Sequence, residues 1–439
     1  MKKLLVLFVA VLIMALPLIT GCGKSTSSSA TSSKPVQLTV AWWGTQIRND
    51  KQQAVFDQYT KENTNVTFDG QPYAYADYYN KLATDAAAKN LPDIYQISST
   101  TMTDYMSKNL MYDMTPYTKN SVIDISKISS ALLEEGSLSG KLYVMPLGIN
   151  AVGLVYNKTL LDKNGITVKD YMNVNDFMVL SKNVYEKTGY KTDLVDGNDN
   201  TFNYISRTNG KFIFDTKGKL NISLATDPEI SQCFQISEKG IKEGWALDMG
   251  VFTSITAGAI EQMPLVYGTD PKRMSWCAFL GSNQLTAAQA AAPKGTELAI
   301  TTLPSDNQKK SNSLSFGTGF AIAANCKNPV EAAKFINYMT NSVKANNILL
   351  AERGIPVSSD VVKAIAPNLD ASTKLVGTFI TNVVSTKCSP VGPGKVTGST
   401  QVIALYKQLQ EQILYGKLSS ANAAQQLFDQ GNKLMANAQ

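Results

Sequence analysis

Residues 36–63, VQLTVAWWGTQIRNDKQQAVFDQYTKEN, carry the pattern that decides the fold. Apolar and β-branched residues alternate over 36–43, which predicts a β-strand, and apolar residues recur at helical spacing over 50–63, which predicts a helix. The pattern repeats along the chain, with strands expected at 65–71 and 91–98 and helices at 76–90 and 102–109. Strands that alternate with helices predict βαβ units, and therefore an α/β fold with a mostly parallel sheet.

Two adjacent tryptophans, Trp42 and Trp43, end the first predicted strand. Neighbouring side chains on a strand point to opposite faces, so the two indoles cannot fill the same core. We expect Trp42 to pack inside and Trp43 to face a ligand; the alternative is that both are buried. Ligands of parallel α/β sheets bind beyond the carboxyl ends of the strands, so the corners at 41–45 and 96–100 are expected on the binding edge.

The first 35 residues have the composition of a targeting segment and a tether. Residues 1–21 combine a basic start with an apolar run, which is typical of a secretory signal peptide. The sequence ITGC ends at Cys22 and resembles the lipobox of bacterial lipoproteins, in which the cysteine is lipidated. Residues 22–35 are small and polar, as in a flexible tether. An ordinary signal peptide that contains a cysteine is the alternative.

The composition excludes several classes of function. The chain has no histidine, which removes Ser–His and Cys–His nucleophile pairs and the HExxH zinc motif. The net charge of +6 is dispersed, so nucleic acid is not an expected partner. Neither a metal nor another cofactor is implied, but a glycosidase that uses only carboxylates stays open. Four further cysteines have no metal-like spacing and are either buried thiols or disulfides: Cys233, Cys277, Cys326 and Cys388.

Several segments, taken in order, resemble one protein family. They are WWGTQIR (42–48), YYNKLATDAAAKNLPDIYQ (78–96), LMYDMTPY (110–117), GKLYVMPLGINAVGLVYNKTLLDKNGI (140–166), KRMSWCAFLGS (272–282), FGTGFAIAANCKNPVEAAKFINYM (316–339) and RGIPV (353–357). The chain resembles the extracellular solute-binding lipoproteins of ABC sugar importers, family 1, the branch of maltose-binding protein. The resemblance implies a monomeric, non-enzymatic receptor that binds an oligosaccharide and delivers it to a separate ABC permease. It also implies a lipid anchor on the extracytoplasmic face of the cell membrane, as on Gram-positive surface lipoproteins.

The same resemblance implies an α/β fold of two lobes, the periplasmic-binding-protein fold of type II, with the ligand cleft between them. The expected crossovers are 145–150, 274–282 and 314–320. The N-lobe would comprise 36–148 and 281–317, and the C-lobe 149–280 and 318–439. Hinge residues absorb backbone rotation, a role for which glycine is suited, so Gly148, Gly317 and Gly319 are the candidate hinge residues.

The matched strand ends and crossovers give the candidate site. Sugars present flat C–H faces and ring hydroxyls, so their binders combine aromatic platforms with hydrogen-bonding groups. Asn150 lies at the first crossover, where the maltose-binding branch carries a cleft residue. The expected ligand-binding residues are Trp42, Trp43, Thr45, Arg48, Ser98, Ser99, Thr100, Asn150, Asn198, Asp199, Phe279 and Ser282. The same fold binding a peptide or another solute is an alternative, which the aromatic residues disfavour.

Arg48 bears on the kind of sugar. The segment 42–48 resembles a subgroup of the family that includes binders of uronate-containing oligosaccharides, and an Arg fork can clamp a carboxylate. The alternative, which we favour, is that Arg48 pairs with Asp50 or Asp57 on the helix surface. A neutral oligosaccharide is therefore the leading expectation.

Overall fold

The structure is a computed structural model of the 439-residue chain, and it describes residues 34–99, 101–195, 200–214, 220, 229–256, 259–389 and 398–437. Cys22, Thr100, Asn198 and Asp199 lie outside the described residues. No described helix is long and apolar enough to cross a membrane.

The first sheet has five strands in the order β2-β1-β3-β12-β6. β1 pairs in parallel with β2 and β3, whereas β12 runs antiparallel to both β3 and β6. The predicted parallel βαβ start of the chain is confirmed, and the returning β12 makes the sheet mixed. The strands are β1 (Val36–Trp43), β2 (Val66–Tyr73), β3 (Ile94–Ser98), β6 (Val144–Pro146) and β12 (Thr318–Ile322).

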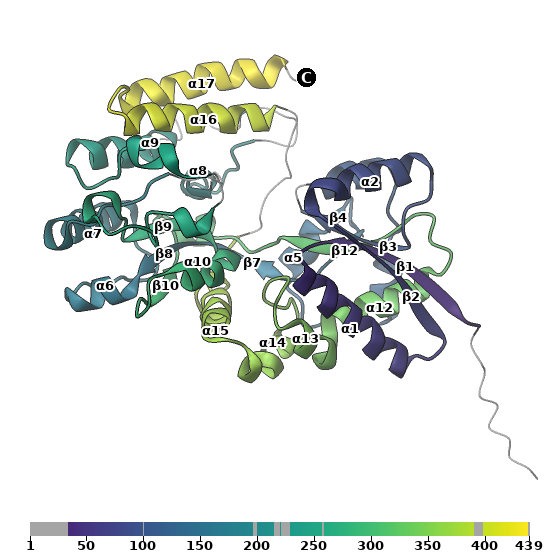
Figure 1. Ribbon diagram of the computed structural model, residues 1–439. Helices are drawn as coiled ribbons and strands as arrows, with labels where there is room; N and C mark the ends of the chain where they lie inside the picture. The colour runs from purple at the N-terminus through teal and green to yellow at the C-terminus, as the bar shows by residue number, and fades with distance from the viewer. Residues whose placement is uncertain are drawn as a thin grey trace, which may run out of the picture. The chain divides into compact units, whose positions relative to one another are not determined.

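Helices cover both faces of the first sheet, and the alternation along β1 explains how (Figure 1). Trp42 packs in one core with residues of α1, α12 and α13, while Trp43 packs on the opposite face with residues of α2 and α3. The two indoles therefore point to opposite faces, as predicted. The helices are α1 (Gln46–Glu62), α2 (Tyr75–Ala87), α3 (Met102–Ser107), α12 (Pro329–Asn341) and α13 (Val343–Leu349). Smaller elements complete this region: α4 (Thr115–Lys119), α5 (Ser130–Glu135), β4 (Ser137–Leu138) and β5 (Lys141–Leu142).

The second sheet has three strands in the order β10-β8-β9, and both pairings are antiparallel. The expectation of a mostly parallel sheet is therefore wrong for this region. The strands are β8 (Val152–Asn157), β9 (Cys277–Gly281) and β10 (Leu298–Thr301). The C-terminal helices α16 (Ser399–Leu414) and α17 (Ser420–Asn437) pack on α9 (Glu229–Lys242) (Figure 1).

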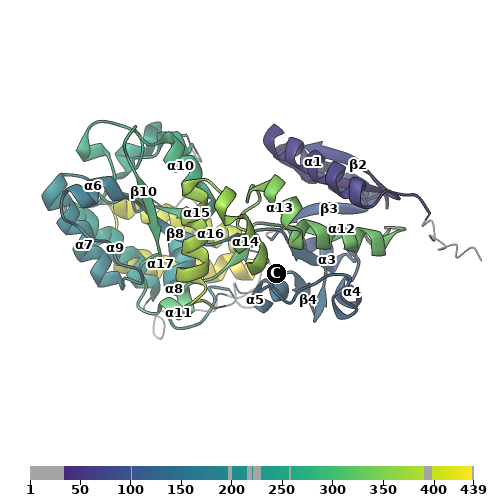
Figure 2. The ribbon, with the colours of Figure 1, turned by 90° about the horizontal axis from the view of Figure 1, so that it is seen from below.

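Further helices surround the second sheet. Figure 2 shows α6, α7 and α10 around β10 and β8. The remaining α-helices are α6 (Lys158–Lys163), α7 (Val174–Thr188), α8 (Asn200–Ser206), α10 (Leu285–Ala291), α11 (Gln308–Ser311), α14 (Ser359–Ile365) and α15 (Ala371–Thr378). The 3₁₀ segments are η1 (Met249–Ser254), η2 (Ile260–Gln262), η3 (Pro271–Arg273), η4 (Ser282–Gln284) and η5 (Ala366–Asn368), and η6 (Phe379–Val384) is a π-helix.

Within the described residues, the chain passes between the two sheets three times, at segments that touch one another. β7 (Ile149–Asn150) follows β6 and pairs with β11 (Ser315–Phe316), which precedes β12. Ile149 also forms a bridge with Ile355. The crossovers expected at 145–150 and 314–320 are therefore confirmed. The third passage lies near Ile355, and not at 274–282, because β9 pairs with β8 inside the second sheet.

The strand pairing also corrects two predicted lobe boundaries. Residues 281–317 were assigned to the N-lobe, but β10 within that range pairs with β8 of the second sheet. Residues 318–439 were assigned to the C-lobe, but β12 pairs with β3 and β6 of the first sheet. Strand pairing that links residues so far apart in sequence carries no local signal.

Two of the three candidate hinge glycines, Gly148 and Gly317, lie where the crossing segments approach closely, and Gly319 lies in β12 of the first sheet. A Cβ atom at Gly148 would lie 2.2 Å from the carbonyl oxygen of Arg353, and one at Gly317 would lie 2.9 Å from Nδ2 of Asn150. At Gly319 the nearest atom, Cγ1 of Val144, would be 2.4 Å away. Close packing therefore explains glycine at all three positions, and the hinge role stays a prediction.

The cysteine question is answered by the described residues. Cys277 and Cys326 are buried and Cys388 is half-buried, and these three are free thiols, while Cys233 is also buried. Within the described part of the chain, no three His, Cys, Asp or Glu residues are grouped as metal ligands would be.

Candidate functional site at the edge of the first sheet

The carboxyl ends of β1, β2 and β3 share one edge of the first sheet, because these three strands are parallel. The chain leaves β1 at Gly44, whose N–H donates to the carbonyl oxygen of Tyr73 at the end of β2 (3.2 Å). Thr45 occupies the N-cap of α1 and is exposed, and its side chain makes no capping hydrogen bond. The edge therefore brings together side chains from three strand-to-helix corners.

An aromatic cluster stands at this edge. Trp43 is only 8% exposed, because rings of α2 surround it: the centroids of Tyr78, Tyr75 and Tyr79 lie 5.0, 5.7 and 5.7 Å from its own. Tyr75 is 61% exposed, although it contacts Trp43 edge-to-face. Trp43 thus supports the cluster, and Tyr75 presents the accessible ring. Tyr75 was not among the expected site residues, and its signal was its place two residues after the end of β2.

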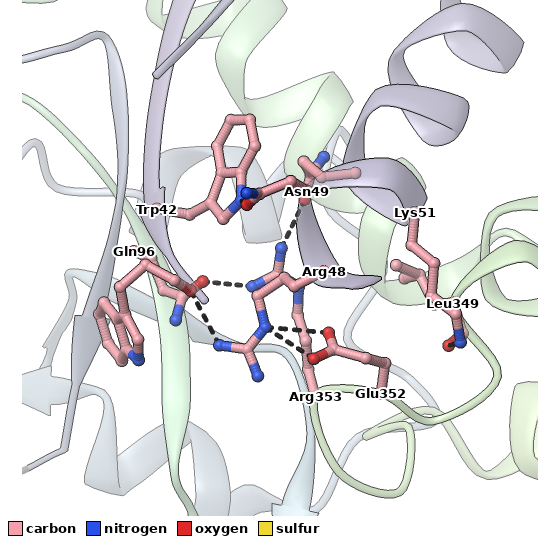
Figure 3. Close-up of polar contacts among 10 residues, drawn as sticks. Trp42, Arg48, Asn49, Lys51, Gln96, Leu349, Glu352 and Arg353 are labelled. Atoms are coloured by element: carbon pink, nitrogen blue, oxygen red, sulfur yellow. Dashed lines mark hydrogen bonds and ion pairs between the residues drawn. The ribbon is translucent and has the colours of Figure 1, made fainter. Parts of the chain in front are cut away.

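Trp42 has the packed position that we expected. It is buried, and its Nε1 donates to Oδ1 of Asn49 (3.0 Å), which satisfies its polar atom (Figure 3). Its ring packs edge-to-face on Phe56 of α1. No face of Trp42 is left for a ligand, so its inclusion among the ligand-binding residues is corrected.

Hydroxyl groups line the edge beside the aromatic cluster. The phenol oxygen of Tyr79 accepts hydrogen bonds from the N–H of Ser98 and from Oγ1 of Thr101, both at 3.0 Å. Ser98 is buried and Ser99 is half-buried. The end of β3 is therefore held by α2, and Ser99 is the more accessible of the two serines.

Arg48 lies across the β1–α1 corner and pairs with a distant carboxylate. Its Nε donates to both oxygens of Glu352 (2.8 and 3.0 Å), and its Nη1 donates to the carbonyl oxygen of Trp43 (3.0 Å) (Figure 3). The expected surface partners of Arg48 are wrong: Asp50 accepts from Gln46 (2.7 Å) and Asp57 accepts from Gln53 (2.9 Å). A partner 304 positions away could not be read from helical spacing.

A second arginine lies buried beneath this corner. Arg353 donates through Nη2 to Oε1 of Gln52 (2.7 Å) and through Nη1 to Oε1 of Gln96, and its guanidinium lies over the ring of Phe320. Burial is the main reason that the pKa of Arg353 falls to about 9, and the charge of Arg48 lowers it further. These bonds fasten α1 and β3 to the segment that leads into the third crossover.

The crossing strands add two polar residues. Asn150 is half-buried on β7, opposite Ser315 of β11. Glu135 of α5 accepts from Oγ of Ser315 (2.7 Å) and from the N–H of Phe316 (3.2 Å). Burial raises the pKa of Glu135 to about 7, and the two hydrogen bonds oppose that rise. Nothing in the sequence pattern singled out Glu135.

The two candidate residues of the second sheet are structural. The ring of Phe279 is 5% exposed and packs on Phe177, with centroids 5.9 Å apart, which corrects its assignment as a ligand contact. Ser282 is fully buried, its Oγ accepts from the N–H of Ala151 (3.1 Å), and its own N–H donates to the carbonyl oxygen of Ala151 (2.7 Å). Both side chains are committed to the core around β8 and β9.

The comparisons with known proteins agree with this geometry. Residues 44–343 match the family model "Bacterial extracellular solute-binding protein". The chain is similar to a lactose-binding protein of Rhizobium radiobacter (25% identity, 43% of this chain and 45% of the relative). It is also similar to an arabinooligosaccharide-binding protein of Bacillus subtilis (25% identity, 53% of this chain and 54% of the relative). The chain thus spans about half the length of these curated relatives.

A solved structure extends the likeness to nearly the whole chain. The extracellular solute-binding protein family 1 structure from Alicyclobacillus acidocaldarius matches with a TM-score of 0.79 at 22% identity, over 92% of this chain and 99% of that one. This likeness shows the fold of the periplasmic solute-binding proteins, an α/β fold with mixed sheets. With the family model matched over more than half of its length, the chain belongs to the bacterial extracellular solute-binding proteins.

Proposed function

We propose that this protein captures an oligosaccharide outside the cell and delivers it to the membrane subunits of an ABC importer. One observation carries the proposal: Tyr75 presents an exposed ring, supported by Trp43, at the shared edge of β1 and β2. A sugar ring stacks on such a platform through its C–H face while its hydroxyls seek hydrogen bonds. The sugars named for the two curated relatives, lactose and arabinooligosaccharides, are of this class.

The residues of this edge have different roles in the proposed site. Tyr75 stacks on the sugar and Trp43 holds Tyr75 in place. Thr45 and Ser99 supply hydroxyls, and Asn150 supplies an amide from a crossing strand. Ser98 and Arg48 position the corners, and Thr100, Asn198 and Asp199 are proposed as further contacts outside the described residues.

The proposed mechanism is closure about the crossing segments. A sugar that contacts the regions around both sheets binds the closed form of the protein more tightly than the open form. Sugar binding therefore shifts the population toward the closed form. Gly148 and Gly317 lie in these segments and Gly319 follows in β12, and rotation at these glycines is the proposed motion. Small-angle scattering should show a smaller radius of gyration at saturating sugar, and an unchanged radius would contradict closure.

The proposed location is the outer face of the cell membrane. Cys22 would carry two acyl chains, which hold a protein where one chain is marginal, and residues 22–35 would act as the tether. The protein would work as a monomer beside its permease. Cys22→Ser should move the protein from the membrane fraction to the medium, and retention of this variant in the membrane would contradict the anchor.

A secreted glycosidase is the rival function, and membership in a family of solute-binding proteins disfavours it. The test titrates the purified protein with lactose, raffinose and arabinotriose while its tryptophan fluorescence is followed. We expect one of these sugars to shift the emission, since Trp43 supports the proposed platform, and to be recovered intact. Recovery of cleaved sugar would favour the glycosidase, and no response to any neutral sugar would count against the proposed function.

A further inference from the structure

Glu352 reaches the proposed binding edge from a remote part of the chain. It lies in the short segment between α13 and the bridge at Ile355, and it meets Arg48 in the first turn of α1 (Figure 3). Both side chains are 16% exposed, so the pair is largely shielded from water. Partial burial makes such a pair stronger than a surface ion pair.

The hydrogen bonds of Arg48 occupy the Nε side of its guanidinium. Its Nε is occupied by both oxygens of Glu352, and its Nη1 is occupied by the carbonyl oxygen of Trp43. Nη2 alone donates no hydrogen bond to the part of the chain that the structure describes. A guanidinium clamps a carboxylate most strongly through two parallel N–H groups, and Glu352 blocks the pair formed by Nε and Nη2.

Glu352 also faces the two other cations of this corner. The Nζ of Lys51 donates to the carbonyl oxygen of Leu349 (2.6 Å); burial lowers the pKa of Lys51, and the charge of Glu352 opposes that change. The charge of Glu352 likewise opposes the lowered pKa of Arg353. Among the described residues, Glu352 is the only carboxylate paired with any of these three cations. Its removal would leave a corner with three positive charges and no counter-ion.

Resting on the proposed function, we infer that Glu352 is a specificity-determining residue that restricts the site to uncharged oligosaccharides. It fills the anion position that Arg48, Lys51 and Arg353 create. A uronate carboxylate directed at Arg48 would meet the carboxylate of Glu352 at close range, and like charges that close repel. A neutral sugar meets no such repulsion, and binds through stacking on Tyr75 and neutral hydrogen bonds.

The test uses two disaccharides that differ only at C6. α-1,4-Galactobiose carries hydroxymethyl groups where α-1,4-digalacturonate carries carboxylates. Isothermal titration calorimetry at pH 7.5 measures both, together with lactose, raffinose and arabinotriose, on the wild type and on Glu352→Gln. Glu62→Gln is the matched control, because Glu62 pairs with Lys344 (2.8 Å) at the other end of α1 and the charge change is identical.

The wild type should bind a neutral sugar, and it should bind digalacturonate about 10- to 100-fold more weakly or not at all. A charge-assisted hydrogen bond that cannot form lowers the affinity by about this factor. Glu352→Gln should improve digalacturonate binding by about the same factor and leave neutral-sugar affinity within about threefold. Glu62→Gln should change neither. Digalacturonate binding by the wild type as tight as that of the neutral sugars, or no gain in Glu352→Gln, would overturn the inference.

The wild type alone separates the possible failures. If Glu352→Gln does not fold, the wild-type ratio of acidic to neutral affinity still decides the question. If the wild-type protein binds none of the neutral sugars, this result counts against the proposed function. The gain in affinity for digalacturonate in Glu352→Gln tests the inference alone.

Discussion

The two sheets differ in strand direction, and this difference determines where a binding site can form. In the first sheet β1, β2 and β3 are parallel, so their carboxyl ends meet at one edge and place Trp43, Tyr75 and Ser99 together. In the second sheet β8, β9 and β10 are antiparallel, so neighbouring strands end at opposite edges. There Phe279 and Ser282 are buried and support the core. Parallel strands therefore gather functional corners, and antiparallel strands disperse them.

The largest expected effect is on the free energy of unfolding, and it tests whether Phe279 supports the core of the second sheet. Phe279→Ala should lower the free energy of unfolding by about 3–5 kcal/mol, because the ring is buried against Phe177 and its loss leaves a cavity. Urea unfolding followed by circular dichroism measures the change. The folded fraction should keep its sugar affinity. A mild loss of stability together with a large loss of affinity would return Phe279 to the binding site and break the contrast.

The second prediction concerns Glu135, which joins α5 to the crossing strand β11. The pKa of Glu135 is raised to about 7 in the folded protein, so the folded state holds this proton more tightly than the unfolded state does. The stabilisation is therefore complete below the usual glutamate pKa and is lost as pH rises toward 7. From pH 4.5 to 8 this group alone should reduce the free energy of unfolding by about 3 kcal/mol.

Glu135→Gln isolates that contribution. The amide keeps a hydrogen-bond acceptor for Ser315 or Phe316 but does not titrate, so this variant should lose less stability between pH 4.5 and 8 than the wild type does. Urea midpoints across this pH range give the comparison. Glu134→Gln is the control, because Glu134 is the exposed neighbour on the same helix. Parallel pH profiles of wild type and Glu135→Gln would contradict the prediction.

The sequence predicted the first sheet well because its evidence is local. The alternation in 36–43 and the helical spacing that follows determine β1 and α1 without any distant contact. The same reasoning placed Trp42 and Trp43 on opposite faces, and the resemblance placed two of the three crossovers. It missed Tyr75 as the accessible ring, since burial of Trp43 by α2 depends on how that helix packs.

The errors all involve contacts between distant parts of the chain. β12 returns to the first sheet and β10 joins the second, and neither pairing leaves a trace in hydrophobic periodicity. The ion pair of Arg48 was sought on its own helix, where Asp50 and Asp57 lie, but its partner Glu352 comes from another segment. Periodicity shows which face of an element is buried, and does not show which remote residue meets it.

The third prediction tests the first-sheet side of the contrast. Tyr75→Ala should weaken sugar binding by about 1–3 kcal/mol if the ring stacks on the sugar, and change the free energy of unfolding by no more than about 0.5 kcal/mol, because the ring is largely exposed. Calorimetric titration and urea unfolding give the two numbers. Tyr415→Ala removes another exposed tyrosine, at the end of α16, and should leave affinity unchanged. Equal affinities in Tyr75→Ala and wild type would remove Tyr75 from the site.

The smallest expected effect compares two serines that follow strands of the two sheets. Ser282→Ala leaves the N–H of Ala151 without its side-chain acceptor in a buried place, so it should cost about 1 kcal/mol of stability and none of the sugar affinity. Ser99→Ala acts at the half-buried edge beyond β3, so it should cost less than about 0.5 kcal/mol of stability and weaken binding by about 0.5–1.5 kcal/mol. Both variants are measured by calorimetric titration and urea unfolding. The comparison separates a serine that supports the fold from a serine that contacts the sugar. If Ser282→Ala weakened binding and Ser99→Ala did not, strand direction would no longer explain where the site lies.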